Sequence, residues 1–252
     1  SKLKSNFTIH LELETGMGRT GFNIADLDNV LKFLQTTKNI KVEGVYTHLS
    51  SADKDQEFTN SQMTLFKQGV AKIKEYYKDI KYIHAEASNG ILNVNDAICN
   101  LVRPGILLYG YPPADNMPKT LNFRPVAKLK SHVLFIKEVP KGTSISYGRT
   151  FITPKKMTIA TIGIGYADGI RRNLSNKGKV IIKDKIVPIV GTGCMDSFVI
   201  DVTDIKDVKG GDYVYIWDNE NITLEEIAEE CNTINYEILS TISNRVPRVF
   251  ID

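Results

Sequence analysis

The 252-residue sequence has little of several features that would place a protein in a class at once. Its cysteines are Cys99, Cys194 and Cys231, and none lies in a CxxC pair or at a metal-ligand spacing from a histidine. This argues against a disulfide framework and a zinc site, and it predicts a reducing, cytoplasmic setting. No apolar run approaches the roughly 18 residues of a membrane helix, and the first residues do not resemble a signal peptide.

Charge is also scarce in any concentrated form. Lysine and arginine number 32 against 29 acidic residues, a formal net charge of +3, and the two signs are interleaved along the chain. Nucleic-acid binding needs a concentrated basic face, so the sequence predicts no nucleic-acid partner. Hydrophobic residues make up 42% and charged residues 24%, which is typical of a globular protein able to bury a core in one or two domains.

The first half of the chain alternates between strand-like and helix-like patterns. Residues 7–13 alternate in polarity with a period of two, whereas residues 59–78 place Met63, Phe66 and Val70 on one helical stripe. Strands are expected at 7–13, 42–49, 82–85 and 100–109, and helices at 25–37, 59–78 and around 90–94. Such alternation favours right-handed βα units around a parallel sheet or barrel.

The second half is rich in β-like runs. They occupy residues 129–136, 157–164, 179–182, 187–190, 198–202 and 213–217. A single helix is expected over residues 223–231, because Thr223 and Glu226 have the spacing of a capping box. Prolines between residues 112 and 125 indicate a linker. The expected domains are therefore residues 1–120 and residues 121–252.

Charged residues cluster on the first expected strand and in the glycine-rich turn after it. In a barrel strand the residues of one parity point inward, so His10, Glu12 and Glu14 share a face. Buried carboxylates need a partner, and Arg19 beyond the turn is the natural one. The alternative is a solvated strand with a surface ion pair.

Three further strings each close an expected strand, at the end where the sites of βα barrels assemble. They carry His48, then His84 and Ser88, then Arg103 and Gly105. A lone histidine or arginine at a strand end is more often structural. Serine hydroxyls and glycine N–H groups at helix starts bind phosphate well, however, and their succession here favours a ligand that contains phosphate.

Tyrosines lie beside glycines at two element ends in the second half. Tyr147 stands in Thr-Ser-Ile-Ser-Tyr-Gly (143–148), Tyr166 in Ile-Gly-Tyr-Ala-Asp-Gly (164–169), and a Cys-Met-Asp turn occupies 194–196. These strings fit a pocket in which a phenol approaches a small substrate closely. Most of the eleven tyrosines are still expected to pack in a core or an interface.

In this order the strings resemble those of the pyridoxal-phosphate-dependent alanine racemases, with residues 14–19 matching that family's Asp-Thr-Gly-Met-Gly-Arg signature. The resemblance implies the second half of a (β/α)8 TIM-type barrel, followed by a C-terminal antiparallel β domain. It also implies interconversion of L- and D-alanine for peptidoglycan synthesis, pyridoxal 5'-phosphate as the cofactor, and a head-to-tail homodimer whose site is shared between subunits.

The family's cofactor contacts transfer to matching positions. The residues implied to bind the cofactor are Ser88, Gly105 and Ile106 at its phosphate, Tyr236 reaching the phosphate, and Arg103 at the pyridine nitrogen. His48 is implied to sit behind Arg103. Arginine donates a hydrogen bond but does not readily give up its proton, so the ring nitrogen would stay neutral and the cofactor would be a weaker electron sink.

The substrate contacts transfer in the same way. The resemblance implies that Tyr147, contributed by the other subunit, is the second acid/base group, and that positive charge from the His48–Arg103 chain activates its phenol. The residues implied to line the substrate side are Arg19, Tyr166, Cys194, Asp196 and Met195, whose backbone amide is the expected donor to the carboxylate.

The chain departs from the family pattern at several positions. Glu12 stands where many relatives have a carbamylated lysine, so it is expected to supply negative charge to Arg19 directly. Ala87 replaces a common asparagine before the serine, Thr192 an arginine before the Cys-Met-Asp turn, and Ser197 a glutamine. These replacements concern the surroundings of the site rather than its acid/base groups.

The family's cofactor-binding lysine, in a Lys-Ala-Asn/Asp-Ala-Tyr-Gly-type string, has no match in this sequence. We therefore expect the chain to be the C-terminal two-thirds of a racemase, missing the N-terminal barrel half and inactive alone. Two alternatives stay open: a serine/alanine racemase domain of a vancomycin-resistance protein, and a non-catalytic cofactor-binding or dimerising fragment. Tyr236 would keep a bulky phenol near the substrate, which favours alanine over serine.

Overall fold

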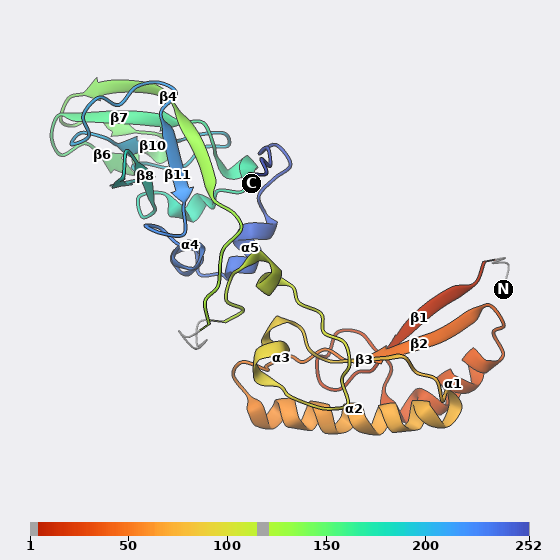
Figure 1. The fold of residues 1–252 in the computed structure, drawn as a ribbon. Helices are drawn as coiled ribbons and strands as arrows, with labels where there is room; N and C mark the ends of the chain where they lie inside the picture. Colours follow the sequence, from red (N-terminus) through yellow and green to blue (C-terminus); the bar gives the residue numbers. More distant parts are fainter. Residues whose placement is uncertain (1–4, 115–120, 252) are drawn as a thin grey trace. The chain divides into compact units, whose positions relative to one another are not determined.

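The computed structural model describes residues 5–114 and 121–251. The chain forms two compact units, of which unit 1 ends at Arg124 and unit 2 begins at Pro125 (Figure 1). Part of the expected linker, residues 115–120, lies outside the described residues. None of the helices within residues 5–114 and 121–251 combines the length and the apolar character needed to cross a bilayer.

Unit 1 is built on a three-stranded parallel sheet in the order β1-β2-β3 (Figure 1). The strands are β1 (Phe7–Glu12), β2 (Ile40–Tyr46) and β3 (Tyr82–His84). The helices are α1 (Leu27–Gln35), α2 (Gln56–Tyr76) and the short α3 (Ser88–Asn93). The βα alternation predicted for this half is thus confirmed, with element ends shifted by a few residues.

One face of this sheet forms the core of unit 1. Leu11, Val45 and Ile83 are buried against the apolar stripes of α1 and α2, whose members include Leu31 and Phe66. Because side chains alternate across a strand, the residues between these positions point to the opposite face. That opposite face carries the polar residues of the candidate site.

The fourth strand expected over residues 100–109 is wrong. Within that range the structure has an isolated bridge between Ala87 and Arg103, followed by a 3-10 helix from Ile106 to Tyr109. Pro104 offers no N–H to a ladder, so pairing cannot continue past Arg103. The backbone then turns at once into the 3-10 helix, which ends at the left-handed Gly110.

Unit 2 is an antiparallel β domain, as predicted, and its main sheet has six strands in the order β10-β7-β4-β11-β8-β9. The strands are β4 (Leu129–Val139), β7 (Met157–Ile162), β8 (Lys179–Ile182), β9 (Lys185–Pro188), β10 (Phe198–Asp201) and β11 (Tyr213–Trp217). A bridge between Ile189 and Ile200 joins the two ends of this order, so the sheet closes on itself. A separate hairpin pairs β5 (Ser144–Ile145) with β6 (Phe151–Ile152).

Two helices, not one, follow the barrel of unit 2. The capping box of α4 (Leu224–Glu230) is confirmed, because Glu226 N–H donates to Thr223 Oγ1 at 3.2 Å and Thr223 N–H donates to the Glu226 carboxylate at 2.7 Å. The prediction of a single helix missed α5 (Asn235–Ser240). This helix has only six residues and begins after Ile234, whose side chain cannot cap it, so the sequence gives no start signal.

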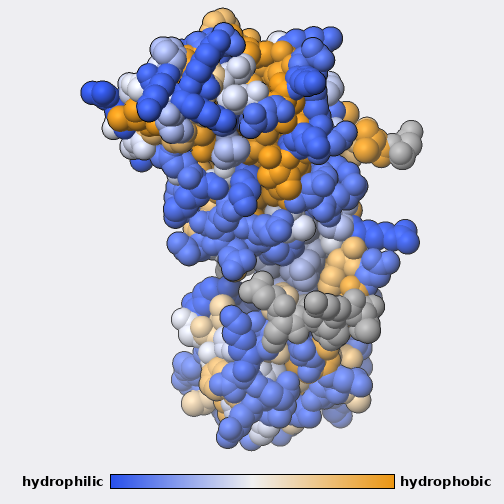
Figure 2. All heavy atoms as spheres, turned by 90° about the vertical axis from the view of Figure 1, so that its left-hand side faces the viewer, coloured by the Kyte–Doolittle hydropathy of each residue, from blue (hydrophilic) through white to orange (hydrophobic). Residues whose placement is uncertain are grey.

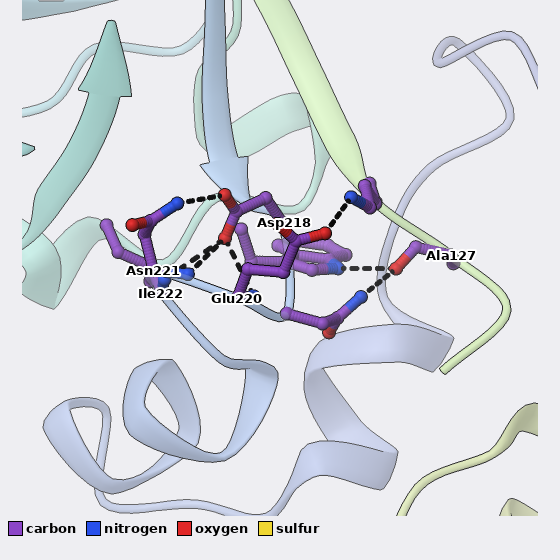
Figure 3. A network of polar contacts seen from close by, with 8 residues as sticks. Ala127, Asp218, Glu220, Asn221 and Ile222 are labelled. Atoms are coloured by element: carbon purple, nitrogen blue, oxygen red, sulfur yellow. Dashed lines mark hydrogen bonds and ion pairs between the residues drawn. The ribbon is translucent and has the colours of Figure 1, made fainter. Parts of the chain in front are cut away.

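The segment just before β4 is tied to the end of β11 and to the turn after it (Figure 3). The Ala127 carbonyl accepts hydrogen bonds from Trp217 Nε1 at 3.3 Å and from Asn219 Nδ2 at 2.6 Å. Burial opposes ionisation of Asp218, but hydrogen bonds from Asn221 and from neighbouring backbone N–H groups outweigh it and lower the pKa of Asp218 to about 2. The turn is therefore a fixed anchor where the chain enters the unit.

Candidate active site

The polar face of the unit 1 sheet carries two rows of residues set by strand register. His10 lies opposite Gly44, and Gly44 lies opposite Tyr82. One step further along, Glu12 lies opposite Tyr46, which lies opposite His84. Parallel pairing thus places charged and aromatic side chains from three strands side by side, although they are 34 or more positions apart in sequence.

Arg103, His84 and His10 form a chain of hydrogen bonds across this face. Arg103 Nη1 lies 2.5 Å from His84 Nδ1, and His84 Nε2 lies 2.9 Å from His10 Nδ1. A guanidinium can only donate, so His84 Nδ1 accepts and its Nε2 carries the proton that is donated to His10. Burial, helped by the charge of Arg103 and by His10, lowers the pKa of His84 to about 4, so this histidine is neutral at pH 7.

Gly44 makes the histidine contact sterically possible. A Cβ atom at this position would come within 2.7 Å of the His10 ring. Real side chains do not approach that closely, so any larger residue would push His10 away from His84. The glycine is therefore a requirement of the network rather than of the strand.

The guanidinium of Arg103 is held on several sides. Its Nη2 donates to the carbonyls of Thr47 at 2.8 Å and Ala85 at 3.2 Å, and its Cζ lies 5.3 Å from the centre of the Tyr46 ring. Tyr46 in turn stacks on His84 with ring centres 5.1 Å apart. No hydrogen bond within the described residues engages Arg103 Nε, so the Nε–H remains for a ligand. Burial lowers the pKa of Arg103 below its ordinary value, yet an arginine stays a cation at neutral pH.

The expectation that His48 sits behind Arg103 stays a prediction, and the histidine that bonds to the guanidinium in the structure is His84. His48 follows the end of β2, and its backbone carbonyl accepts a hydrogen bond from Gln62 Nε2 at 3.2 Å. Burial, then the positive charges of Arg103 and Arg19, lower the pKa of His48. His48 is thus near enough to feel the guanidinium without bonding to it.

The expected phosphate-binding residues come together in unit 1. Gly105 N–H donates to Ser88 Oγ at 2.9 Å, although the two residues are 17 positions apart. Ser88 is the buried first residue of α3, and Ile106 is the buried first residue of the next 3-10 helix. A hydroxyl and the backbone N–H groups at these two helix starts suit the oxygens of a phosphate.

The expected ion pair between Glu12 and Arg19 does not form in the described structure. The Glu12 carboxylate accepts hydrogen bonds from Tyr46 Oη at 3.1 Å and Thr20 Oγ1 at 2.8 Å. The Arg19 side chain is exposed. Its backbone N–H donates to the other carboxylate, that of Glu14. Glu12 therefore bonds to Tyr46, which lies beside Arg103, and not to Arg19.

Glu14 closes the glycine-rich turn from within. It accepts backbone N–H groups from Gly16 at 2.5 Å, Gly18 at 2.8 Å and Arg19 at 3.3 Å. Burial opposes its ionisation, but these N–H groups together outweigh that effect and lower the pKa of Glu14. Charge sign alone does not explain this position, because the carboxylate also shapes the loop that presents Arg19.

Unit 2 brings its three predicted strings together through backbone contacts. Tyr166 N–H donates to the Cys194 carbonyl at 3.1 Å, and Ala167 N–H donates to the Met195 carbonyl at 2.8 Å. Ser146, next to Tyr147, donates its hydroxyl to the Thr192 carbonyl at 2.5 Å and lies 3.5 Å from Cys194 Sγ. The strings around residues 147, 166 and 195 thus form one surface of unit 2.

The backbone around Tyr147 is strained. Ser146 has φ 60° and ψ −169°, a region that side chains rarely adopt, and Gly148 and Arg149 also have positive φ. Such conformations persist only where the surroundings enforce them, and they are frequent at functional sites. The strained turn leaves the Tyr147 side chain 71% exposed.

The remaining candidates of unit 2 are also accessible. Tyr166 and Met195 are exposed, Asp196 is exposed beside the Ser197 hydroxyl, and Tyr236 lies half-buried on α5. Figure 2 shows apolar side chains interrupting the hydrophilic surface of unit 2. An exposed phenol and thioether on strained or tightly held turns are suited to contact a ligand or a partner surface.

Comparison with known proteins assigns the chain to a family. The family model described as alanine racemase, N-terminal domain matches residues 1–113, and that described as alanine racemase, C-terminal domain matches residues 126–250. The chain is 40% identical to an alanine racemase of Carboxydothermus hydrogenoformans, over 99% of this chain and 69% of that protein. It is 41% identical to alanine racemase 2 of Caldanaerobacter subterraneus subsp. tengcongensis, over 96% of this chain and 64% of that protein.

Solved structures agree with the sequence comparison. The alanine racemase from Bacillus anthracis with bound L-Ala-P superposes with a TM-score of 0.92 at 37% identity, covering 99% of this chain and 66% of that one. The fold shared with such structures is a TIM-like barrel domain followed by a β domain. The chain spans 64 to 65% of the length of the first relatives that it matches. On both its domain matches and its identity to these relatives, the chain belongs to the alanine racemase family.

Proposed function

We propose that this protein is a pyridoxal-phosphate-dependent racemase that interconverts L- and D-alanine. The observation that carries the proposal is the state of Arg103, a half-buried cation fixed by His84 and two carbonyls, with Nε left to donate. Membership in the alanine racemase family supports the same reaction. The interpretation of residues 1–120 as the second half of the barrel stays a prediction.

The residues of unit 1 fit the cofactor that the family uses. The Ser88 hydroxyl, whose oxygen is fixed by the Gly105 N–H, and the Ile106 N–H would hold its phosphate, and Arg103 would donate to its ring nitrogen. Tyr236 of unit 2 is proposed to reach the phosphate as well. When bound, the cofactor supplies electron withdrawal that weakens the bond between the substrate α-carbon and its hydrogen.

Arg103 would limit that electron withdrawal, and its hydrogen bonds with His84 and, through it, His10 hold the guanidinium in place. Because the guanidinium would donate a hydrogen bond without giving up its proton, Arg103 would keep the ring nitrogen of a bound cofactor neutral and so disfavour side reactions. A neutral His84 can accept from Arg103, whereas a protonated one would repel it. The low pKa of His84 therefore preserves the donor geometry throughout the neutral range.

Tyr147 is proposed as the acid/base group on one face of the substrate. A phenol with an ordinary pKa of about 10 is a weak base at pH 7, so it needs cations nearby. We propose that it receives them from the Arg103 and His48 region of a second copy of the chain, in a homodimer with shared sites. Its 71% exposure in one chain is consistent with insertion into a partner.

The substrate carboxylate is proposed to bind the Met195 backbone N–H and Arg19. The Met195 N–H donates no hydrogen bond within the described residues, and Arg19 has an exposed guanidinium. Cys194, Asp196 and Tyr166 complete this side of the pocket. A small α-amino acid is the substrate class that these short-range contacts suit.

Two other functions make different predictions. A serine racemase would convert L-serine in preference to L-alanine, and a non-catalytic module would retain the cofactor without converting either amino acid. The test incubates the full-length protein that contains this chain, with added pyridoxal phosphate, with each enantiomer of alanine and serine, and follows the opposite enantiomer by chiral chromatography. Cofactor retention is read from visible absorbance after gel filtration. Conversion of alanine in preference to serine supports the proposal, and cofactor retention without conversion contradicts it.

A further inference from the structure

A buried carboxylate in unit 2 joins the C-terminal segment to the turn that presents Met195. Asp168 is only 6% exposed. Its Oδ2 accepts the Gly165 N–H at 2.9 Å, and its Oδ1 lies 3.3 Å from Arg245 Nε. One side chain therefore links a functional turn with residues near the end of the described chain.

The first side of this link fixes the Cys194–Met195 turn. The turn from Gly165 to Asp168 donates two N–H groups, from Tyr166 and Ala167, to the carbonyls of Cys194 and Met195. A Cβ atom at Gly165 would lie 2.5 Å from both of those carbonyl oxygens, so only glycine allows the approach. Both carbonyls that flank the unengaged Met195 N–H are thus held by one turn.

The second side fixes Asp168 itself. Ser243 N–H donates to the Asp168 carbonyl at 3.0 Å. Gly169 has φ +109°, and a Cβ atom there would lie only 2.6 Å from the Thr241 carbonyl oxygen, so the two segments approach closely. Arg245 adds the ion pair to the carboxylate. The segment from residue 241 to residue 245 therefore packs on the turn through backbone and side chain together.

Arg248 stiffens the same segment. Its guanidinium donates to the carbonyls of Ile242 at 2.7 Å, Ser243 at 2.5 Å and Val246 at 2.7 Å. These bonds fold the end of the chain into a closed loop around one cation. Arg245 is thereby presented to Asp168 by a rigid support rather than by a free tail.

We propose that Arg245 and Asp168 are positioning residues, which hold the Met195 N–H in the direction of the substrate carboxylate from outside the pocket. Neither touches the substrate. The chain of contacts runs from Arg245 to Asp168, then through the Gly165–Ala167 backbone to the carbonyls on either side of that N–H. The substrate role of Met195 rests on the proposed function, whereas the mechanical link does not.

The test compares Arg245→Ala and Asp168→Asn with the wild-type protein in two independent measurements. Asp168→Asn keeps an oxygen for the Gly165 N–H and removes only the charge. The first measurement is the resonance and hydrogen exchange of the Met195 amide in protein labelled with 15N-methionine, assigned by Met195→Leu. Both variants should shift that resonance and speed its exchange, while the other methionine amides stay in place.

The second measurement is the racemisation of alanine. Both variants should raise KM roughly threefold to tenfold with little change in kcat, because the lost alignment weakens binding of ground state and transition state alike. Arg245→Lys should recover part of the effect. Lys156→Ala is the matched control, since it removes an exposed ion pair with Glu138 elsewhere in unit 2, at 2.8 Å.

If the resonance and the hydrogen exchange of the Met195 amide are unchanged in both variants, the link from Arg245 and Asp168 to Met195 is overturned, whatever the activity. A moved amide with unchanged KM overturns the positioning role. If the wild-type protein does not racemise alanine, the proposed function fails by itself, and the amide measurement still decides whether the link exists. Circular dichroism and the fluorescence of Trp217, the single tryptophan, establish that each variant is folded.

Discussion

The two units hold their candidate residues by different means. In unit 1, side chains bond to side chains on the face of a parallel sheet, where His84 is buried and Arg103 is half-buried. In unit 2, the side chains of Tyr147, Tyr166 and Met195 are exposed. The turns that carry them are held through backbone groups, by the N–H groups of residues 166 and 167 on the carbonyls of residues 194 and 195, and by the Ser146 hydroxyl on the Thr192 carbonyl.

This difference separates two tasks of a site. Side-chain networks in a low-dielectric environment fix protonation and charge, because each group sets the pKa and tautomer of the next. Backbone-held turns fix position while leaving the side chain free to meet something that comes from outside. Unit 1 therefore controls the charge and protonation of its own side chains, whereas unit 2 leaves the side chains of its turns accessible.

The largest effect that tests this difference between the units is expected on removal of the Arg103 cation from unit 1. Arg103→Ala should abolish racemisation and cofactor retention, because it removes the ring-nitrogen donor and leaves the Thr47 and Ala85 carbonyls without their partner. Each buried carbonyl left unpaired costs about 1–3 kcal/mol of unfolding free energy. Visible absorbance, chiral chromatography and urea unfolding measure the three effects.

Arg103→Lys is the matched variant for that experiment. It keeps the charge but cannot bond to His84 and the two carbonyls from one planar group. We expect cofactor retention to recover in part and turnover to remain low. Wild-type turnover in Arg103→Lys would show that a positive charge at this position suffices, and that the hydrogen bonds between Arg103, His84 and His10 are not needed for turnover.

Removing a presented group from unit 2 should affect turnover without affecting stability. Tyr147→Phe removes one exposed hydroxyl, so the unfolding free energy should stay within about 0.5 kcal/mol of wild type. Turnover in both directions should fall by about 10² to 10⁴, the usual contribution of a general acid/base. Tyr213→Phe, which alters another exposed tyrosine of unit 2, is the control.

Mixing variants tests whether the two units of one site come from different chains. A heterodimer of Arg103→Ala and Tyr147→Phe would contain one site with both groups intact if sites are shared. Activity should then appear on mixing two inactive proteins. A verified heterodimer that stays inactive would place both groups in the same chain and contradict the shared site.

The smallest expected effect is the pH dependence of stability that the neutral His84 gives to unit 1. The pKa of His84 is about 4 in the fold against about 6.5 when unfolded, so between these values the unfolded state binds more protons. The stability contributed by neutral His84 is full above pH 6.5 and is lost as the pH falls toward 4. Between pH 7 and pH 5 this loss should be about 2 kcal/mol.

Urea unfolding at both pH values measures that loss, and His84→Gln should reduce it. Far-UV circular dichroism follows both units, whereas Trp217 fluorescence follows unit 2 alone, so the effect should appear in the first signal. His132→Gln, in β4 of unit 2, is the control and should leave the unit 1 loss intact. An equal pH dependence in wild type and His84→Gln would contradict the low pKa.

Much of the fold could be predicted from local pattern. The strands β8 and β11 match their expected ranges, and the capping box of α4 forms as its spacing predicts. Short elements failed where local signals were weak. Residues 100–109 look strand-like, yet Pro104 stops pairing, and α5 lacks a capping side chain.

The candidate site was predictable in its members more than in its bonds. Tyr166, Cys194 and Met195 do meet, and Gly105 does reach Ser88. The bond between His84 and Arg103 was not predicted, because the resemblance placed only His48 behind Arg103. Strand parity together with parallel register would have pointed to His84 and His10, but register is set by the sheet and not by either strand alone.

The sequence by itself determined which residues alternate, which helices begin where, and which short strings place this chain among the alanine racemases. These are properties of neighbours along the chain, where covalent geometry fixes the spacing. Tertiary structure alone decided that Glu12 bonds to Tyr46 instead of Arg19, that His84 is neutral, and that the C-terminal segment braces Asp168. Those outcomes depend on burial and on approach between distant segments, because the energy of a charge or hydrogen bond is set by what surrounds it in space.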